Sequence, residues 1–98
     1  MNRKKIRDEF VRRFYRALAR YEANIGRCAT RTRQMIDRWG VIGTAKRLAA
    51  QRYVSAGFRS LGASGSIERA MVMQKFRILF TEQDVANARS KLRAMRNS

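Results

Sequence analysis

Apolar residues recur every three or four positions along the first forty residues of the chain. Beginning at Ile6, the mostly apolar series runs through Phe10, Phe14, Leu18, Tyr21, Ile25, Cys28, Thr32, Met35 or Ile36, and Trp39. This spacing is the period of one helical face, and it continues past Gly26. It predicts a long helical region over about residues 3–39, formed by one helix or by two that meet at a break near Gly26. The side chains on this face, including those of Cys28 and Trp39, are expected to be buried.

Glycines and capping residues divide the middle of the chain. Gly40 is a typical helix end, and Thr44 is a candidate N-cap for a short helix over residues 45–53. Glycines and serines over residues 54–65 predict a loop, which Phe58 and Leu61 would hold against the core. We place Trp39 in a buried corner between the long helical region and the short helix.

Two further helices are predicted toward the C-terminus. Ser66 can cap a helix over residues 67–75. Thr81, followed three residues later by Asp84, resembles a capping box for a last helix over residues 82–95. Because no segment shows the sustained alternation of a strand, we expect an all-α fold. The expected architecture is a compact bundle of four or five helices in a single domain over residues 1–98.

The chain is strongly basic. It holds 23 Lys and Arg against 7 Asp and Glu, a formal net charge of +16, and the excess is spread along its whole length. Such a charge attracts polyanions. Arginine is far commoner here than lysine, and its paired N–H groups suit phosphate and carboxylate oxygens. A solvated basic surface without a specific partner is the alternative that the charge leaves open.

Ten basic residues are candidates for contacts with nucleic acid. Arg12, Arg16 and Arg20 are spaced i, i+4, i+8, so on a helix they form one row on the side away from Phe10 and Phe14. Arginines 27 and 31 would extend the row if the helix continued, and a second cluster follows the glycines at 40 and 43. The full set is Lys5, Arg12, Arg13, Arg16, Arg20, Arg27, Arg31, Lys46, Arg47 and Arg52.

Aromatic side chains could add stacking on bases. Tyr15 is the best candidate for an exposed ring beside the arginine row. Tyr21 and Trp39 lie on the apolar face, so we expect both in the core.

The sequence argues against catalysis. It has no histidine, which is the commonest general base and metal ligand, and its seven acidic residues form no cluster typical of a metal-dependent nuclease. We therefore expect no enzyme activity, no metal, no cofactor and no small-molecule substrate. No apolar run approaches the roughly 18 residues that span a bilayer, and the N-terminus lacks a secretory signal. A cytoplasmic location is expected, with Cys28 a free and inert thiol.

Scattered residues carry a resemblance to a group of prokaryotic proteins. They are Tyr21, Gly26, Met35-Ile36, Gly40-Val41, Ala45-Lys46-Arg47-Leu48, Gly57-Phe58, Leu61, Leu79-Phe80-Thr81, Ala88-Arg89 and Leu92. Over about residues 20–93 the chain resembles a small, mostly uncharacterised helical domain that occurs alone or beside restriction-type and HNH-type nuclease regions. It departs from that pattern at Cys28-Ala29, where relatives tend to have a proline. The resemblance implies an accessory module in a DNA-related setting, such as restriction or defence, and no catalytic residue.

Three readings of the function follow from these observations. The first is a non-catalytic helical protein that binds DNA or RNA, with DNA ranked first, mainly through phosphates. The alternative is an interaction subunit that docks its basic face on an acidic partner protein. Binding of the basic amphipathic first helix to a membrane surface is a third reading, ranked below these because the core needs the apolar face of that helix.

Overall fold

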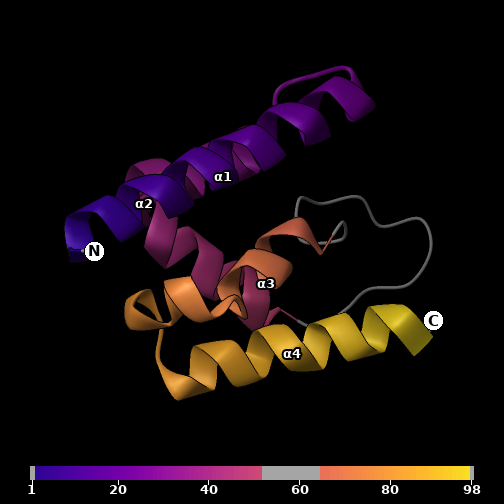
Figure 1. Ribbon diagram of the computed structural model, residues 1–98. Helices are drawn as coiled ribbons and strands as arrows, with labels where there is room; N and C mark the ends of the chain where they lie inside the picture. Colours follow the sequence, from indigo (N-terminus) through magenta and orange to yellow (C-terminus); the bar gives the residue numbers. More distant parts are fainter. Residues whose placement is uncertain (1, 52–64, 98) are drawn as a thin grey trace.

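Helices make up nearly all of the residues that the structure describes. The structure is a computed structural model that describes residues 2–51 and 65–97 (Figure 1). Its elements are α1 (Arg3–Ile25), α2 (Thr30–Ala50), α3 (Ser66–Met71), the 3-10 helix η2 (Gln74–Leu79) and α4 (Glu82–Asn97). The expected all-α bundle of four or five helices is therefore confirmed. The expected loop over residues 54–65, with Phe58 and Leu61, lies almost wholly outside the described residues.

Helix α1 follows its sequence pattern closely. The Asn2 side chain caps the helix by accepting a hydrogen bond from the Lys5 amide, 2.9 Å away. Phe10, Phe14 and Leu18, spaced by four residues, are completely buried. The helix ends at Gly26, whose φ of 72° lies in the left-handed region that glycine adopts without strain. The break that the sequence allowed near this glycine is therefore present.

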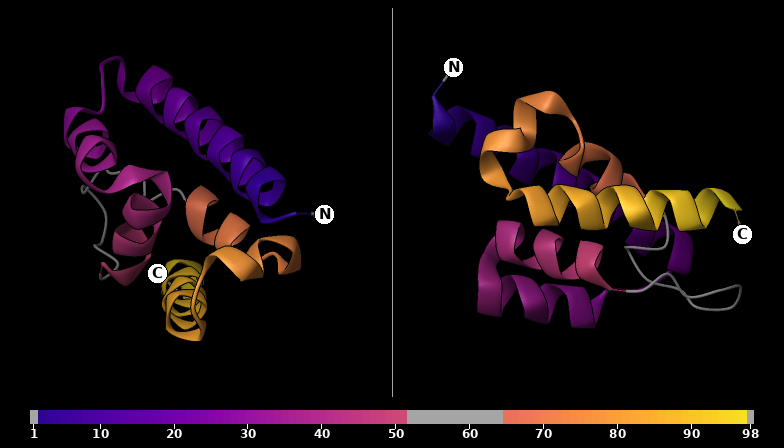
Figure 2. Two further views of the ribbon diagram at one scale, coloured as in Figure 1. Left: turned by 90° about the vertical axis from the view of Figure 1, so that its left-hand side faces the viewer. Right: turned by 90° about the horizontal axis from the view of Figure 1, so that it is seen from below.

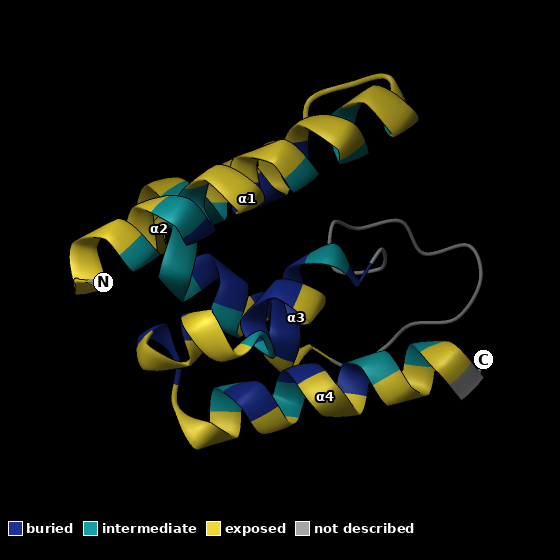
Figure 3. Ribbon diagram, viewed as in Figure 1, coloured by how far each residue is buried: buried dark blue, intermediate teal, exposed yellow. Residues whose placement is uncertain are grey.

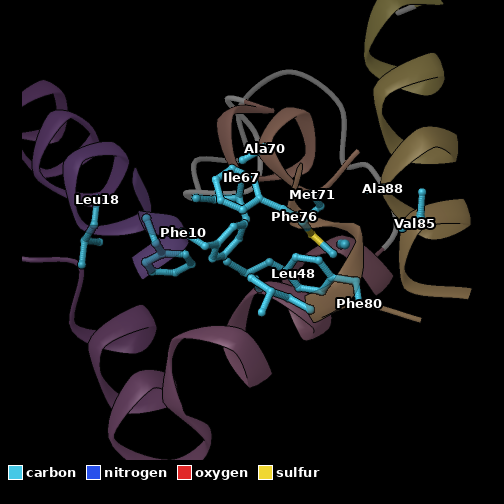
Figure 4. Close-up of a cluster of buried hydrophobic side chains, with 14 of the residues drawn as sticks. Phe10, Leu18, Leu48, Ile67, Ala70, Met71, Phe76, Phe80, Val85 and Ala88 are labelled. Carbon is cyan, nitrogen blue, oxygen red and sulfur yellow. The ribbon is translucent and has the colours of Figure 1, made fainter. Parts of the chain in front are cut away.

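The helices enclose one core. Helix α1 and helix α4 lie on opposite sides of the molecule, with α3 and the second half of α2 between them (Figures 1 and 2). Within the core, the Phe10 ring meets the rings of Phe76 and Phe80 edge to face, with centroids 5.3 and 5.1 Å apart (Figure 4). Leu48 from α2 and Val85 from α4 belong to the same buried cluster. The outward side of α1 is exposed along its length (Figure 3).

Helix α2 consists of two halves that meet at Gly40. Gly40 has φ 74° and ψ 175°, which is not helical, so the chain changes direction there. The second half contributes Thr44, Ala45, Leu48 and Ala49 to the interior, whereas the first half buries only Thr32. The first half therefore lies at the margin of the core.

The prediction that Trp39 is buried is wrong. Trp39 is 39% exposed, because it is the last residue before the kink at Gly40 and lies beyond the edge of the core. After the kink, the half-buried Val41 and Ile42 pack against the core, whereas Trp39 does not. Cys28 is exposed as well, since it lies in the turn between α1 and α2, where helical periodicity does not apply.

Two of the expected caps are also corrected. Thr44 is fully buried inside α2 and caps nothing, because the helix resumes at the kink, before Thr44. Its hydroxyl has no hydrogen-bond partner among the described residues. Ser66 is the first residue of α3 and not its cap, since Gly65, with φ 74°, occupies the N-cap position. The helix also ends at Met71, before the expected residue 75, and the chain continues as the 3-10 helix η2.

The capping box before α4 is confirmed. The Thr81 amide donates to Asp84 Oδ2 at 2.9 Å, and the Asp84 amide donates to Thr81 Oγ1 at 3.1 Å. Helix α4 then runs two residues beyond the expected end. None of the helices in the described ranges combines the length and the apolarity needed to cross a membrane.

Candidate nucleic-acid interface

Five of the ten candidate residues lie together on the outward side of α1. At 100° per residue, Lys5, Arg12 and Arg16 lie opposite the buried face of the helix. Arg13 and Arg20 lie at the edge of this group, on the side that faces α3. All five are exposed, and in residues 2–51 and 65–97 none has a carboxylate oxygen within 4.0 Å. We call them the α1 basic surface: Lys5, Arg12, Arg13, Arg16 and Arg20.

One edge of the α1 basic surface borders a small hollow. Arg13, Arg16 and Arg20 line a space of about 170 Å³ between α1 and α3, together with Ser66 and buried core residues. Three arginine side chains of the α1 basic surface therefore border one hollow. The Arg13 guanidinium also lies 5.6 Å from the Phe76 ring centroid, which holds the side chain near the surface of the helix.

Arg27 and Arg31 do not extend the row on α1. Because α1 ends at Gly26, Arg27 lies in the turn and Arg31 lies in the first turn of α2. Both line a second hollow, of about 400 Å³, with Tyr21, Cys28 and apolar residues of both helices. We call this space the turn hollow.

The second predicted cluster does not act as one group. Lys46 is half-buried, and its Nζ lies 3.4 Å from Asp84 Oδ2 of α4. Arg47 points elsewhere, with its guanidinium carbon 3.9 Å from the Trp39 ring centroid. Arg52 lies outside the described residues. Of these three residues, Arg47 is exposed and has no carboxylate oxygen within 4.0 Å in residues 2–51 and 65–97.

Sequence reasoning missed a surface around Trp39. Besides Arg47, the Arg38 guanidinium lies 5.2 Å from the same ring centroid. The ring forms one wall of an open hollow of about 410 Å³, which we call the Trp39 hollow. Its lining residues are Arg31, Met35, Trp39, Arg47, Ala50 and Gln51. The signal in the sequence was the pair Arg38-Trp39 directly before a glycine, where a helical wheel no longer describes the orientation of the ring.

The two hollows along α2 adjoin each other. Arg31, Met35 and Gln51 line both of them. The surface that joins them extends from the turn after α1 to the kink at Gly40 and includes the exposed arginines 27, 31 and 47.

Several other cations are compensated by carboxylates and are poor candidates for a polyanion. Arg33 makes two hydrogen bonds of 2.7 Å to the Glu22 carboxylate, which also accepts one of 2.7 Å from the Ala29 amide. The hydrogen bonds from Arg33 and Ala29 lower the pKa of Glu22 to about 2. Lys75 binds Glu9 at 2.6 Å, and this hydrogen bond lowers the pKa of Glu9. The charges of Arg13 and Arg12 lower the pKa of Glu9 as well, although neither makes an ion pair with it within 4.0 Å in the described part of the chain.

The expected exposed aromatic residue is present on α1. Tyr15 is 42% exposed, and its ring contacts Phe14 with centroids 6.3 Å apart. Among the described residues, no arginine stacks on the Tyr15 ring. Tyr15 and Trp39 thus differ in surroundings although their exposures are similar.

The described residues contain no group of three or more histidine, cysteine or acidic side chains that could hold a metal ion. Comparison with known proteins adds no assignment, since no family model, no curated protein and no solved structure matches this chain.

Proposed function

We propose that this protein binds nucleic acid through phosphate contacts made by the α1 basic surface. The observation that carries the proposal is the set of five exposed cations on one side of a single helix, none within 4.0 Å of a carboxylate oxygen in the described ranges. From Lys5 to Arg20 this surface extends for about 22 Å along the helix axis, which equals roughly six base pairs of duplex. A rigid helix therefore holds several cations at the spacing of a phosphate backbone.

The arrangement favours a polyanion over a solvated face. Like charges four residues apart destabilise a helix modestly, so Arg12, Arg16 and Arg20 weaken α1 in the absence of a partner. Phosphates that neutralise these charges would release condensed counterions and offset the repulsion. No base edge is needed for such contacts, so binding of this kind carries little sequence preference. We propose a binding role without catalysis, as an accessory module beside a nuclease region, which is the setting that the sequence resemblance implies.

The test is the salt dependence of binding. Replacement of all three arginines (Arg12→Gln, Arg16→Gln, Arg20→Gln) should flatten the slope of log affinity against log salt by about 3 units, one for each phosphate contact removed. Circular dichroism should be nearly unchanged, since glutamine forms helices almost as well as arginine.

A matched control removes the same charge from the opposite side of the molecule. Arg89, Arg93 and Arg96 are exposed on α4, and their replacement by glutamine lowers the net charge equally. The control should keep most of the slope. Equal slopes for both triple variants would show that net charge rather than this surface drives binding. If the unmodified protein shows no salt-sensitive binding to nucleic acid, the alternative function, docking of the basic face on an acidic partner protein, would be favoured instead.

A further inference from the structure

We propose that the Trp39 hollow stacks an unpaired base, so that the nucleic acid this protein takes is single-stranded or locally unpaired. This inference rests on the proposed function and specifies its substrate class. Phosphate contacts alone do not distinguish paired from unpaired strands, whereas a stacking ring reaches only a base whose face is free.

The first observation is the state of the Trp39 ring. A tryptophan side chain is largely apolar, yet 39% of Trp39 is in contact with solvent. The nearby guanidinium groups of Arg47, at 3.9 Å, and Arg38, at 5.2 Å, make this a ring held in place by cations. Bases stack on arginine planes as well as on aromatic rings. Trp39 and Arg47 therefore form one composite stacking surface.

The second observation is the shape and chemistry of the space beside the ring. The Trp39 hollow has a volume of about 410 Å³, enough for a base, and Met35 and Ala50 contribute apolar side chains to its lining. Gln51 adds an amide, which both donates and accepts hydrogen bonds, as a base edge does. Arg31 lies at the opposite end of the hollow from the kink and suits an adjoining phosphate.

The third observation concerns the type of occupant. The Trp39 hollow continues into the turn hollow, which is lined by Tyr21 and the exposed Arg27. A small molecule would fill one hollow, whereas an extended strand can follow both and place successive phosphates near arginines 27, 31 and 47. In the described ranges none of these three arginines has a carboxylate within 4.0 Å, so their charge is available to a strand.

The kink positions the stacking surface. A Cβ atom at Gly43 would lie 2.9 Å from the Trp39 Cβ, so the turn of helix after the kink packs directly against the base of the tryptophan side chain. This close approach brings Arg47, one turn further along, over the ring. The base of the Trp39 side chain is therefore packed, and Arg47 lies over the ring, before any ligand binds, which lowers the entropic cost of stacking.

The experiment compares two single strands of equal length and phosphate count, one with all its bases and one with abasic sites. Trp39 is the only tryptophan in the chain, so its fluorescence reports on this hollow alone. The base-bearing strand should bind about tenfold more tightly than the abasic strand at the same salt concentration, and it should quench Trp39. The abasic strand and a blunt duplex should leave the emission nearly unchanged. DNA and RNA strands should both quench, since every base has a stacking face.

Variants separate this inference from the proposed function. Trp39→Leu should remove the preference for the base-bearing strand while the salt slope stays the same. Tyr15→Leu, the change at the other exposed ring, should keep the preference. Equal affinity for the two strands, or loss of the preference only on Tyr15→Leu, would overturn the stacking inference and leave phosphate binding intact. If neither strand binds, the proposed function fails together with it.

Discussion

The Nζ of Lys91 lies 3.4 Å from Glu68 Oε1, and both side chains are almost completely buried. Lys91 also donates a 2.7 Å hydrogen bond to the Leu48 carbonyl, so one cation joins α2, α3 and α4. Burial raises the pKa of Glu68, and the attraction of Lys91 opposes that rise. Each buried charge is thus compensated by the other, so the loss of one partner would leave the other buried without a counter-charge.

Replacement of Lys91 by methionine should destabilise the protein at neutral pH by about 3 kcal/mol, since it leaves the Glu68 carboxylate buried without a counter-charge. The loss should shrink as the pH falls, because protonation of Glu68 removes the uncompensated charge. Urea unfolding at several pH values measures both effects. A loss that does not change with pH would show that packing rather than charge is responsible.

The double variant Glu68→Leu, Lys91→Met should recover most of the stability lost by Lys91→Met. Replacement of a whole buried ion pair by apolar residues of similar volume is often neutral or stabilising. A double variant as unstable as Lys91→Met alone would contradict this account of the pair.

Glu22→Gln should flatten the acid limb of the stability profile. The folded-state pKa of Glu22 is about 2, against an ordinary value of 4.5. A lowered pKa contributes stability that is present above about pH 4.5 and is lost as the pH falls toward 2. The melting temperature of Glu22→Gln should therefore be below that of the unmodified protein at pH 7 and converge with it near pH 2. Asp37→Asn, at an exposed carboxylate of α2 without a described ion pair, is the control and should show no such convergence.

Trp39 fluorescence should be quenched more strongly by iodide than by caesium at equal ionic strength. The ring is 39% exposed, and arginines 38 and 47 lie over it, so an anion is concentrated near it and a cation is repelled. Added salt should reduce the difference by screening. Poor quenching by both ions would show that the ring is covered in solution.

Gly43→Ala should destabilise the protein by about 1–3 kcal/mol, the usual range for overpacking. The added methyl group would meet the Trp39 Cβ at 2.9 Å, so the two halves of α2 must move apart. Because Arg47 lies over the ring only in the present geometry, the Trp39 emission should change as well. A variant with unmodified stability and emission would contradict the close packing at the kink.

Cys28 should react with a thiol reagent in the native protein, at one equivalent per chain. The side chain is exposed in the turn between α1 and α2. Labelling should therefore need no denaturant, and its rate should rise little in urea. A thiol that reacts only after unfolding would restore the buried position that the apolar series predicted.

The sequence by itself determined the features that depend on neighbours along the chain. Helix α1, its buried face of Phe10, Phe14 and Leu18, and its exposed basic face follow from a spacing of four residues. The capping box of Thr81 and Asp84 also needs only local backbone geometry. These elements could be predicted because the spacing and the capping hydrogen bonds that identify them span four residues or fewer, although the partners that bury Phe10 lie far along the chain.

Only the tertiary structure decided which residues of the apolar series are buried in the core. The apolar series through Cys28 and Trp39 keeps a helical phase, but the turn after Gly26 and the kink at Gly40 direct both side chains to the surface. A helical period gives the angle of a side chain about its own helix and not the distance of that helix from the core. The Glu68–Lys91 pair and the stacking of Arg47 on Trp39 depend in the same way on the path of the chain between distant or kinked segments, because a contact of this kind exists only when folding brings the two side chains together.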